Sequence, residues 1–182
     1  MTDRALRRGL LLDRDGVINV DKGYVHKKED FEFIPGIFDL VRRATELDYA
    51  IIIITNQSGI GRGYYTEEEF HGLMNWVSER FSRQGGRIDA VYFCVDDPSK
   101  FDEGRWLQTR RKPNPAMILE AQRDYSLDLG KSILVGDKFS DIEAGIRAGV
   151  NRVFLFSDSK QSGDGLLING LSEILLVLDF ER

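Results

Sequence analysis

The stretch GLLLDRDGVINVD, Gly9–Asp21, runs three leucines directly into the charged triplet Asp13, Arg14 and Asp15 and then reaches a glycine. Such a transition is ordinary where a buried strand simply ends at the surface, because Asp and Gly are common turn residues. A functional interpretation therefore requires matching polar residues at the ends of other strands in the chain.

Short apolar runs that do not alternate with polar residues recur along the chain at 10–12, 50–55, 91–95, 132–136 and 152–156. Runs of this kind are typical of strands buried on both faces. Amphipathic segments separate or follow them at 35–48, 66–81, 114–125, 140–149 and 171–180, and Thr66 with Glu69 forms a capping-box pattern. This alternation predicts an α/β fold with a doubly wound, mostly parallel, Rossmann-like sheet.

The composition bounds both the size of the fold and its partners. A chain of 182 residues with 42% hydrophobic content supports one core, so we predict a single domain over 1–182. A net charge of −5 argues against nucleic acid and acidic membranes as partners and favours a small soluble molecule. The single cysteine, Cys94, and the lack of a long apolar span or signal-peptide core predict a cytoplasmic protein.

Chemically capable residues follow the predicted strands in order: Asp13 and Asp15, Thr55 and Asn56, Arg111 and Lys112, then Asp137, Lys138 and Asp141. The carboxyl ends of parallel strands meet at one edge of the sheet, so these side chains are expected to converge there. Clustered carboxylates repel one another unless a cation lies between them, and oxygen ligands suit a hard ion. The sequence therefore predicts a bound Mg²⁺.

A metal site alone does not explain the hydroxyl and the lysine at the same edge. A phosphoryl group does, because its oxygens need hydrogen-bond donors and positive charge as the transition state forms. In this interpretation Asp13 attacks phosphorus and forms an aspartyl phosphate. Asp15 acts as the general acid for the leaving oxygen and as the base for the hydrolytic water.

The motifs DRDG, TNQSG, RKP and GDKFSD resemble the four motifs of the haloacid dehalogenase (HAD) superfamily of phosphohydrolases. Within that superfamily, DRDGVINVDKGYVHKKEDFEFIPG and TNQSGIGRGYYTEEEF resemble the branch that contains the D,D-heptose 1,7-bisphosphate and the histidinol-phosphate phosphatases. The resemblance extends from about Leu10 to Phe156. It implies an enzyme without a cap domain, roofed only by loops, that removes the C7 phosphate from a heptose bisphosphate.

Matching the motifs residue by residue assigns roles within the site. Asp13 resembles the nucleophile and Asp15 the acid/base, while Thr55 and Lys112 resemble the groups that hold the phosphoryl. The implied Mg²⁺ ligands are Asp13, Asp15 through its backbone carbonyl, and Asp137. The implied substrate contacts are Asp21, Lys22, Gly23, Tyr24, Asn56, Gln57, Ser58, Arg111 and Lys138, to which the glycine-rich loop GIGRG adds Arg62. Arg111 is our candidate for the second, unreacted phosphate.

One segment departs from the family pattern. Many relatives carry a structural zinc held by a Cys-x-His pair and a later Cys-x-Cys pair, whereas here the corresponding positions are Cys94, Asp96, Gln108 and Arg110. Structural zinc needs four good nitrogen or sulfur ligands, so we predict that no structural zinc is bound. We expect this loop to be fixed instead by Phe101 and Trp106 packing down and by Asp96 or Asp97 pairing with Arg110.

Three alternatives stand beside this interpretation. The same chemistry could serve histidinol phosphate or another small sugar phosphate. A receiver-type switch also combines strand-end acids, a threonine and a lysine, although there the phosphorylated aspartate follows a middle strand and here it follows the first. The chain could also be an inactive binding module on the same fold. We expect a monomer that acts on a small phosphorylated sugar.

Overall fold

Strand β1, Gly9–Leu12, lies inside a six-stranded parallel sheet with the order β3-β2-β1-β4-β5-β6. The structure is a computed structural model that describes residues 6–102, 104–157 and 165–180. The other strands are β2 Ala50–Asn56, β3 Ala90–Cys94, β4 Ile133–Gly136, β5 Arg152–Phe156 and β6 Leu166–Ile168. The strand order reverses between β1 and β4, and ligands of doubly wound sheets bind at the carboxyl edge of such a switch point.

All five predicted strands form, and their pairing is parallel throughout. The sixth strand was not predicted, because three residues with two exposed leucines carry too little pattern to identify. The predicted α/β, doubly wound architecture is confirmed.

The five predicted amphipathic segments are helical: α1 Ile37–Glu46, α3 Glu67–Arg83, α5 Ala116–Tyr125, α6 Phe139–Ala148 and α7 Ser172–Asp179. The capping box at the start of α3 is present, because the Glu69 N–H donates to Thr66 Oγ1 at 3.1 Å and the Thr66 N–H donates to Glu69 Oε2 at 2.8 Å. Short turns of helix that the sequence did not predict are η1 Lys28–Asp30, α2 Ser58–Gly61, η2 Pro98–Lys100, α4 Arg105–Gln108 and η3 Leu129–Lys131.

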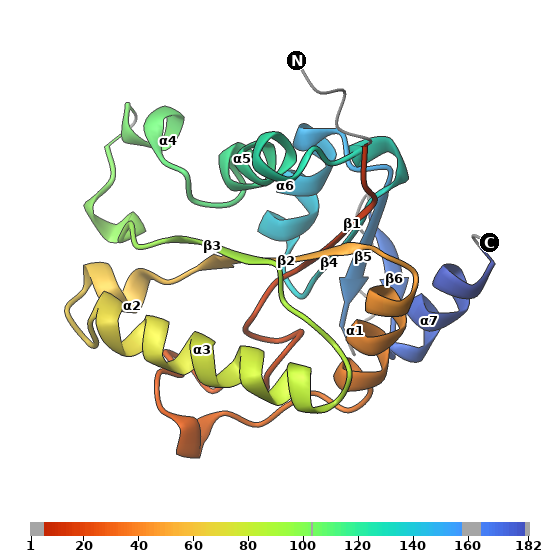
Figure 1. Cartoon of the computed structure of the whole chain (residues 1–182). Helices are drawn as coiled ribbons and strands as arrows, with labels where there is room; N and C mark the ends of the chain where they lie inside the picture. The colour runs from red at the N-terminus through yellow and green to blue at the C-terminus, as the bar shows by residue number, and fades with distance from the viewer. Residues whose placement is uncertain (1–5, 103, 158–164, 181–182) are drawn as a thin grey trace.

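The helices form layers on both faces of the sheet (Figure 1). Helices α1, α3 and α7 cover one face, and α5 and α6 cover the other. Within β1, Leu10 and Leu12 pack into the first core while Leu11 packs into the second. Burial on both faces explains why the strands read as continuous apolar runs rather than as an alternating pattern.

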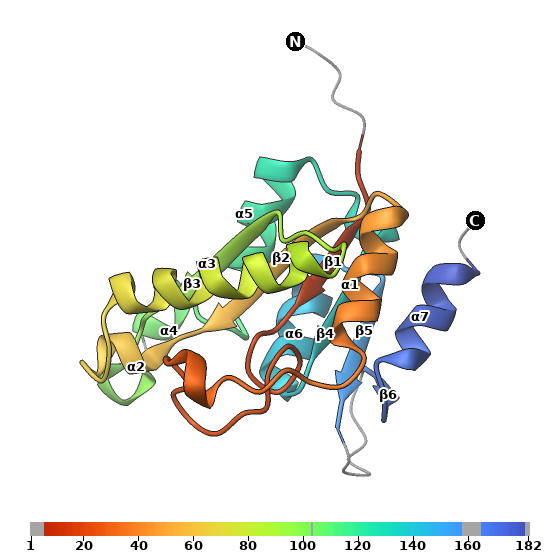
Figure 2. The same ribbon diagram turned by 60° about the horizontal axis from the view of Figure 1, so that its bottom comes forward.

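Two long connections leave the carboxyl edge of the sheet, and they form the roof of the molecule at that edge. Residues 13–36 contain only η1, and residues 95–115 contain only η2 and α4, so no cap domain occurs among the described residues. Figure 2 shows the first connection running beside α2, which follows β2. None of the helices in the described part of the chain combines the length and the apolar character needed to cross a membrane.

The layered core makes a direct stability prediction. Leu40 on α1 is fully buried, whereas Leu176 on α7 is 60% exposed. We expect Leu40→Ala to lower the free energy of unfolding by about 2–5 kcal/mol, because it leaves a cavity between helix and sheet. The matched control Leu176→Ala should change it by less than about 0.5 kcal/mol. Urea denaturation measures both, and equal effects would contradict the assigned core.

Candidate active site

The Lys112 ammonium lies between two carboxylates at the carboxyl edge of β1. Its Nζ is 2.8 Å from Asp13 Oδ1 and 2.7 Å from Asp141 Oδ1, and it donates to the Ile54 carbonyl at 2.7 Å. Lys112 is only 3% exposed. Burial by itself would lower the pKa of Lys112, but the charges of Asp13 and Asp141 outweigh it and raise that pKa. The lysine is therefore a fixed positive charge inside the site.

Three carboxylates converge beside this lysine. Ligand oxygens of Asp13, Asp137 and Asp141 lie within 4.8 Å of one another. Burial, with a further contribution from the Asp13 charge, raises the pKa of Asp137 to about 8. Burial also raises the pKa of Asp13, although Lys112 opposes that rise.

The same cluster suits a hard divalent cation. Asp137 Oδ1 is buried and has no hydrogen-bond partner, so a carboxylate oxygen is left for a cation to bind. The atoms that these three side chains offer to a metal are all oxygens, which is the ligand type that Mg²⁺ prefers. The predicted ligands Asp13 and Asp137 are thus brought together. Asp141, which the sequence placed at the edge without a metal role, joins them; its signal was the second aspartate of GDKFSD.

Two glycines allow the carboxylates to approach the backbone this closely. Gly16 has φ +89°, and a Cβ there would lie 2.2 Å from Asp137 Oδ2. A Cβ at Gly136 would lie 2.2 Å from the Cβ of Asp141. Gly16, the last residue of the DRDG motif, therefore allows both the turn and the close approach of Asp137.

The Asp15 carboxylate is held by three donors. Its Oδ1 accepts from Arg14 Nη2 at 2.7 Å and from Asn19 Nδ2 at 3.0 Å, whereas its Oδ2 accepts from one donor among the described residues, Gln57 Nε2 at 3.0 Å. The Gln57 Nε2 also donates to Thr55 Oγ1 at 2.8 Å. Since Thr55 accepts this bond, its own O–H is left to donate to a bound group.

The Asn56 side chain forms two hydrogen bonds with the backbone of Lys112. Its Nδ2 donates to the Lys112 carbonyl at 3.2 Å, and its Oδ1 accepts from the Lys112 N–H at 3.1 Å. The predicted substrate contact at Asn56 is thus engaged in two hydrogen bonds that fix the position of the lysine.

These groups surround a cavity of about 330 Å³. It is lined by Asp13, Asp15, Asp21, Gly23, Tyr24, Thr55, Asn56, Gln57, Ser58, Tyr65, Arg111, Lys112, Lys138, Ser140 and Asp141. Most of the sequence-predicted site residues therefore share one cavity. Tyr65 and Ser140 were not predicted, because nothing in their spacing distinguishes them from other polar residues that follow a strand.

Two predicted substrate residues lie outside this lining. The Lys22 ammonium pairs with Glu32 at 3.0 Å. Arg62 donates from Nε to Asp97 Oδ1 at 3.1 Å and from Nη1 to the Tyr24 hydroxyl at 2.8 Å. Arg62 therefore joins the two roof connections to each other, since Tyr24 belongs to the first and Asp97 to the second.

The cavity holds two cations besides Lys112. Lys138 pairs with Asp21 at 2.9 Å; burial would lower the pKa of Lys138, but the Asp137 charge and the Asp21 contact raise it. Arg111 donates from Nη1 to the backbone carbonyl of Asp96 at 3.4 Å, and within the described residues it forms no ion pair. Arg111 is therefore the cation of the lining that is best placed to take an anionic group of a ligand.

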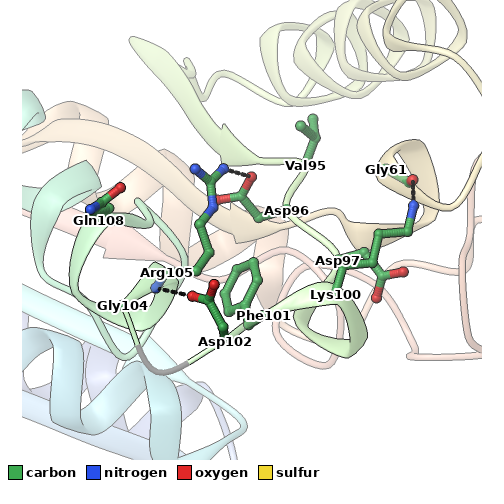
Figure 3. A pocket seen from close by; sticks show the side chains of 10 residues that line it. All are labelled: Gly61, Val95, Asp96, Asp97, Lys100, Phe101, Asp102, Gly104, Arg105 and Gln108. Atoms are coloured by element: carbon green, nitrogen blue, oxygen red, sulfur yellow. Dashed lines mark hydrogen bonds and ion pairs between the residues drawn. The ribbon is translucent and has the colours of Figure 1, made fainter.

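The connection that delivers Arg111 is held by polar contacts (Figure 3). Asp96 pairs with Arg105 at 3.0 Å and accepts from the Thr109 hydroxyl at 2.6 Å, and the Thr109 Oγ1 lies 3.8 Å from Cys94 Sγ. A second cavity, of about 530 Å³, opens between this connection and Gly61.

The rings of Phe101 and Trp106 contact each other edge-on, with centroids 4.7 Å apart, while Trp106 is 45% exposed. That these two rings fix the connection by packing down stays a prediction. The predicted pairing of Arg110 with Asp96 or Asp97 is wrong, because Arg110 pairs with Glu120 on α5. Arg105 and Arg62 occupy the two aspartates instead. The absence of a structural zinc stays a prediction.

Comparisons with known proteins agree with this geometry. A HAD-hydrolase-like family model matches residues 109–168. The D-glycero-alpha-D-manno-heptose-1,7-bisphosphate 7-phosphatase of Burkholderia mallei is 53% identical over 157 residues, covering 85% of this chain and 82% of the relative. The D-glycero-beta-D-manno-heptose-1,7-bisphosphate 7-phosphatase of Helicobacter pylori (strain ATCC 700392 / 26695) is 45% identical over 149 residues, covering 81% of this chain and 83% of the relative.

Solved structures share the fold. The D,D-heptose 1,7-bisphosphate phosphatase of B. bronchiseptica, complexed with magnesium and phosphate, superposes with a TM-score of 0.83 at 25% identity, covering 96% of this chain and 99% of that one. A HAD-like phosphatase structure from Mesorhizobium loti superposes with a TM-score of 0.81 at 32% identity, covering 96% of this chain and 85% of that one.

The repulsion within the carboxylate cluster makes a testable prediction about metal binding. We expect Asp137→Asn to raise the melting temperature of the metal-free protein, because the buried Asp137 carboxyl must either take up a proton on folding or repel Asp13, and a neutral amide does neither. It should also largely abolish the stabilisation by Mg²⁺, which for the wild type amounts to about 2.7 kcal/mol at 100 times the dissociation constant. Thermal denaturation with Mg²⁺ or chelator measures both effects.

Asp48→Asn is the matched control. The Asp48 carboxylate is exposed, and it pairs with Arg7 and Arg87, which are not part of the carboxylate cluster. This variant should keep the full Mg²⁺ increment. An unchanged increment in Asp137→Asn would exclude Asp137 as a ligand.

Proposed function

The chain belongs to the D-glycero-D-manno-heptose-1,7-bisphosphate 7-phosphatases, a family of HAD-like phosphoric monoester hydrolases, and on this basis we propose that it removes the C7 phosphate of the heptose bisphosphate through an aspartyl phosphate on Asp13. The product is the heptose 1-phosphate. Family membership favours an enzyme over the receiver-type switch and over the inactive binding module.

The observation that carries the proposal is the buried set of charges around Asp13. A nucleophilic carboxylate must stay ionised and must meet a trianionic transition state, and both needs require concentrated positive charge. The Lys112 ammonium, 2.8 Å from Asp13 and held on the other side by Asp141, supplies a fixed part of that charge. A turn that only ended a strand would not require a buried lysine between two carboxylates.

The reaction has two balanced steps. In the first, an Asp13 carboxylate oxygen bonds to phosphorus while the bond between phosphorus and the C7 oxygen breaks, and Asp15 gives its proton to that oxygen. In the second, water attacks the same phosphorus, Asp15 takes the proton of the water, and the bond from phosphorus to Asp13 breaks. Inorganic phosphate leaves, and both carboxyls return to their starting states.

Asp15 Oδ2 is the better candidate for the proton-carrying oxygen. Its Oδ1 already accepts from Arg14 and Asn19, whereas its Oδ2 accepts a single bond from Gln57. The Oδ2 atom therefore keeps the greater capacity for a further hydrogen bond to the leaving oxygen or to water.

Asp13, Asp137 and the backbone carbonyl of Asp15 would hold Mg²⁺, with Asp141 close by. When bound, the ion neutralises charge on the phosphoryl oxygens and orients the group for in-line attack. The Thr55 hydroxyl would hold the same phosphoryl oxygens from the protein side. The Lys112 ammonium would stabilise them by its charge, and would donate to one of them in place of one of its three present acceptors, Asp13, Asp141 and the Ile54 carbonyl.

The substrate contacts follow from the lining of the cavity. Arg111 would bind the phosphate that does not react, because a guanidinium matches a phosphate bidentately. Asp21, Gly23 and Tyr24 would face the sugar from one side, and Ser58 and Lys138 from the other sides of the cavity. Lys22 and Arg62 would act indirectly, through Glu32 and through the roof contact.

We further propose a monomer of one domain over 1–182 that works in the cytoplasm without structural zinc. In support of the compartment, the unpaired, buried Cys94 suits a reducing environment. The Thr109–Asp96 contact offers a means of fixing the second roof connection without a metal.

Asp13→Asn tests the covalent mechanism. We expect phosphate release from the heptose bisphosphate to fall below about 10⁻³ of the wild-type rate, because an amide cannot attack phosphorus. A panel of the two heptose bisphosphate anomers, histidinol phosphate and common sugar phosphates, each with Mg²⁺ and with chelator, measures the activity. Full activity of the variant would exclude the aspartyl phosphate, and a better rate on histidinol phosphate would promote that alternative.

Arg111→Ala tests the assignment of the second phosphate. We expect kcat/KM for the bisphosphate to fall about 10- to 100-fold, since a hydrogen-bonded charge pair is lost. A heptose 7-phosphate without the second group should lose far less. Arg110→Ala is the matched control, because this neighbouring arginine pairs with Glu120 outside the cavity lining. Equal losses on the two substrates would overturn the assignment.

A further inference from the structure

Tyr65 is linked to Asp15 and Thr55 through the side chain of Gln57. It is 4% exposed, and its hydroxyl donates to Gln57 Oε1 at 2.6 Å. Gln57 itself is 2% exposed.

The Gln57 amide is satisfied at both ends. Its Nε2 donates to Asp15 Oδ2 at 3.0 Å and to Thr55 Oγ1 at 2.8 Å, and its Oε1 accepts from Tyr65. The opposite amide orientation would place a carbonyl oxygen against the Asp15 carboxylate, and two acceptors repel. The observed orientation therefore depends on a donor for Oε1, because a buried carbonyl without one is costly.

The surroundings of Tyr65 fix the position of its ring and keep its hydroxyl protonated. The His26 ring stacks on it with centroids 4.9 Å apart and an angle of 3° between the planes. A Cβ at Gly59 would come within 2.3 Å of the Tyr65 ring, so the backbone of α2 also confines it. Burial raises the pKa of Tyr65 to about 12, so the hydroxyl keeps its proton at neutral pH.

We infer that Tyr65 is a positioning residue that acts through Gln57 to hold the acid/base Asp15. The inference rests on the proposed function for the role of Asp15. In the absence of the tyrosine hydroxyl, the Gln57 amide loses its fixed orientation. Asp15 Oδ2, the proposed proton-carrying oxygen, then loses the one donor that it has within the described part of the chain.

Tyr65→Phe is the test, because it keeps the ring and removes only the hydroxyl. Proton donation matters for an alkyl leaving group and little for p-nitrophenol, which leaves without a proton. We expect kcat/KM for the heptose bisphosphate and for simple alkyl phosphates to fall about 5- to 20-fold, the size of one buried hydrogen bond. For p-nitrophenyl phosphate the loss should be several times smaller. Equal losses on both kinds of substrate would overturn the inference.

A double-mutant cycle with Gln57→Leu tests the path of the effect. In that background Tyr65→Phe should cause less than about a 2-fold further loss, because there is no amide left to orient. Multiplicative losses would show that Tyr65 acts by another route. The matched control Tyr125→Phe removes a tyrosine hydroxyl that donates to the Asp89 carbonyl at 2.7 Å, outside the cavity lining. It should leave kcat/KM and its leaving-group dependence unchanged.

A measurement without turnover separates this inference from the proposed function. The side-chain amide protons of Gln57, assigned by their loss in Gln57→Leu, should exchange slowly with solvent in the wild type and much faster in Tyr65→Phe. If the wild type failed to hydrolyse the heptose bisphosphate, the proposed function would fall while the amide exchange and the alkyl phosphate series still tested Tyr65. Unchanged amide exchange in Tyr65→Phe would overturn the inference itself.

Discussion

The ammonium of Lys112 between Asp13 and Asp141 is the interaction on which the rest of the site depends. Two carboxylates buried at the end of a sheet would be unfavourable alone, and removal of one partner from a buried ion pair typically costs about 3–5 kcal/mol. The lysine also joins three separate parts of the chain, since Asp13 follows β1, Asp141 belongs to α6 and Lys112 lies near the end of the second roof connection. The reactive centre therefore requires that connection to be in its observed place.

The sequence predicted the sheet and the central chemical groups for the same physical reason. Parallel strands buried on both faces produce continuous apolar runs, and their carboxyl ends must meet at one edge. Asp13, Thr55 and Asp137 are fixed by that edge, so their meeting follows from the strands alone. Asp141 was visible in the same motif but lies one helical turn further along, where the strand argument no longer determines its direction.

Side-chain pairing within the roof was less predictable. The partner of Arg110 depends on the path of the second connection past α5, and the partner of Arg62 depends on where Tyr24 and Asp97 meet. Neither path has a periodic signal in the sequence. Tyr65 was not predicted for a related reason. Its proposed role depends on the orientation of the Gln57 amide, which the spacing of residues in the sequence does not reveal.

The two hydrogen bonds between the Asn56 side chain and the backbone of Lys112 make the position of the lysine independent of the path of the roof connection. Asn56 is the last residue of β2, so the lysine is registered against the rigid sheet rather than against the connection that carries it. Upstream of this anchor, the connection can change in length and in composition without displacing the reactive charge. The anchor therefore allows substrate selectivity to diverge while the groups that break the bond stay in place.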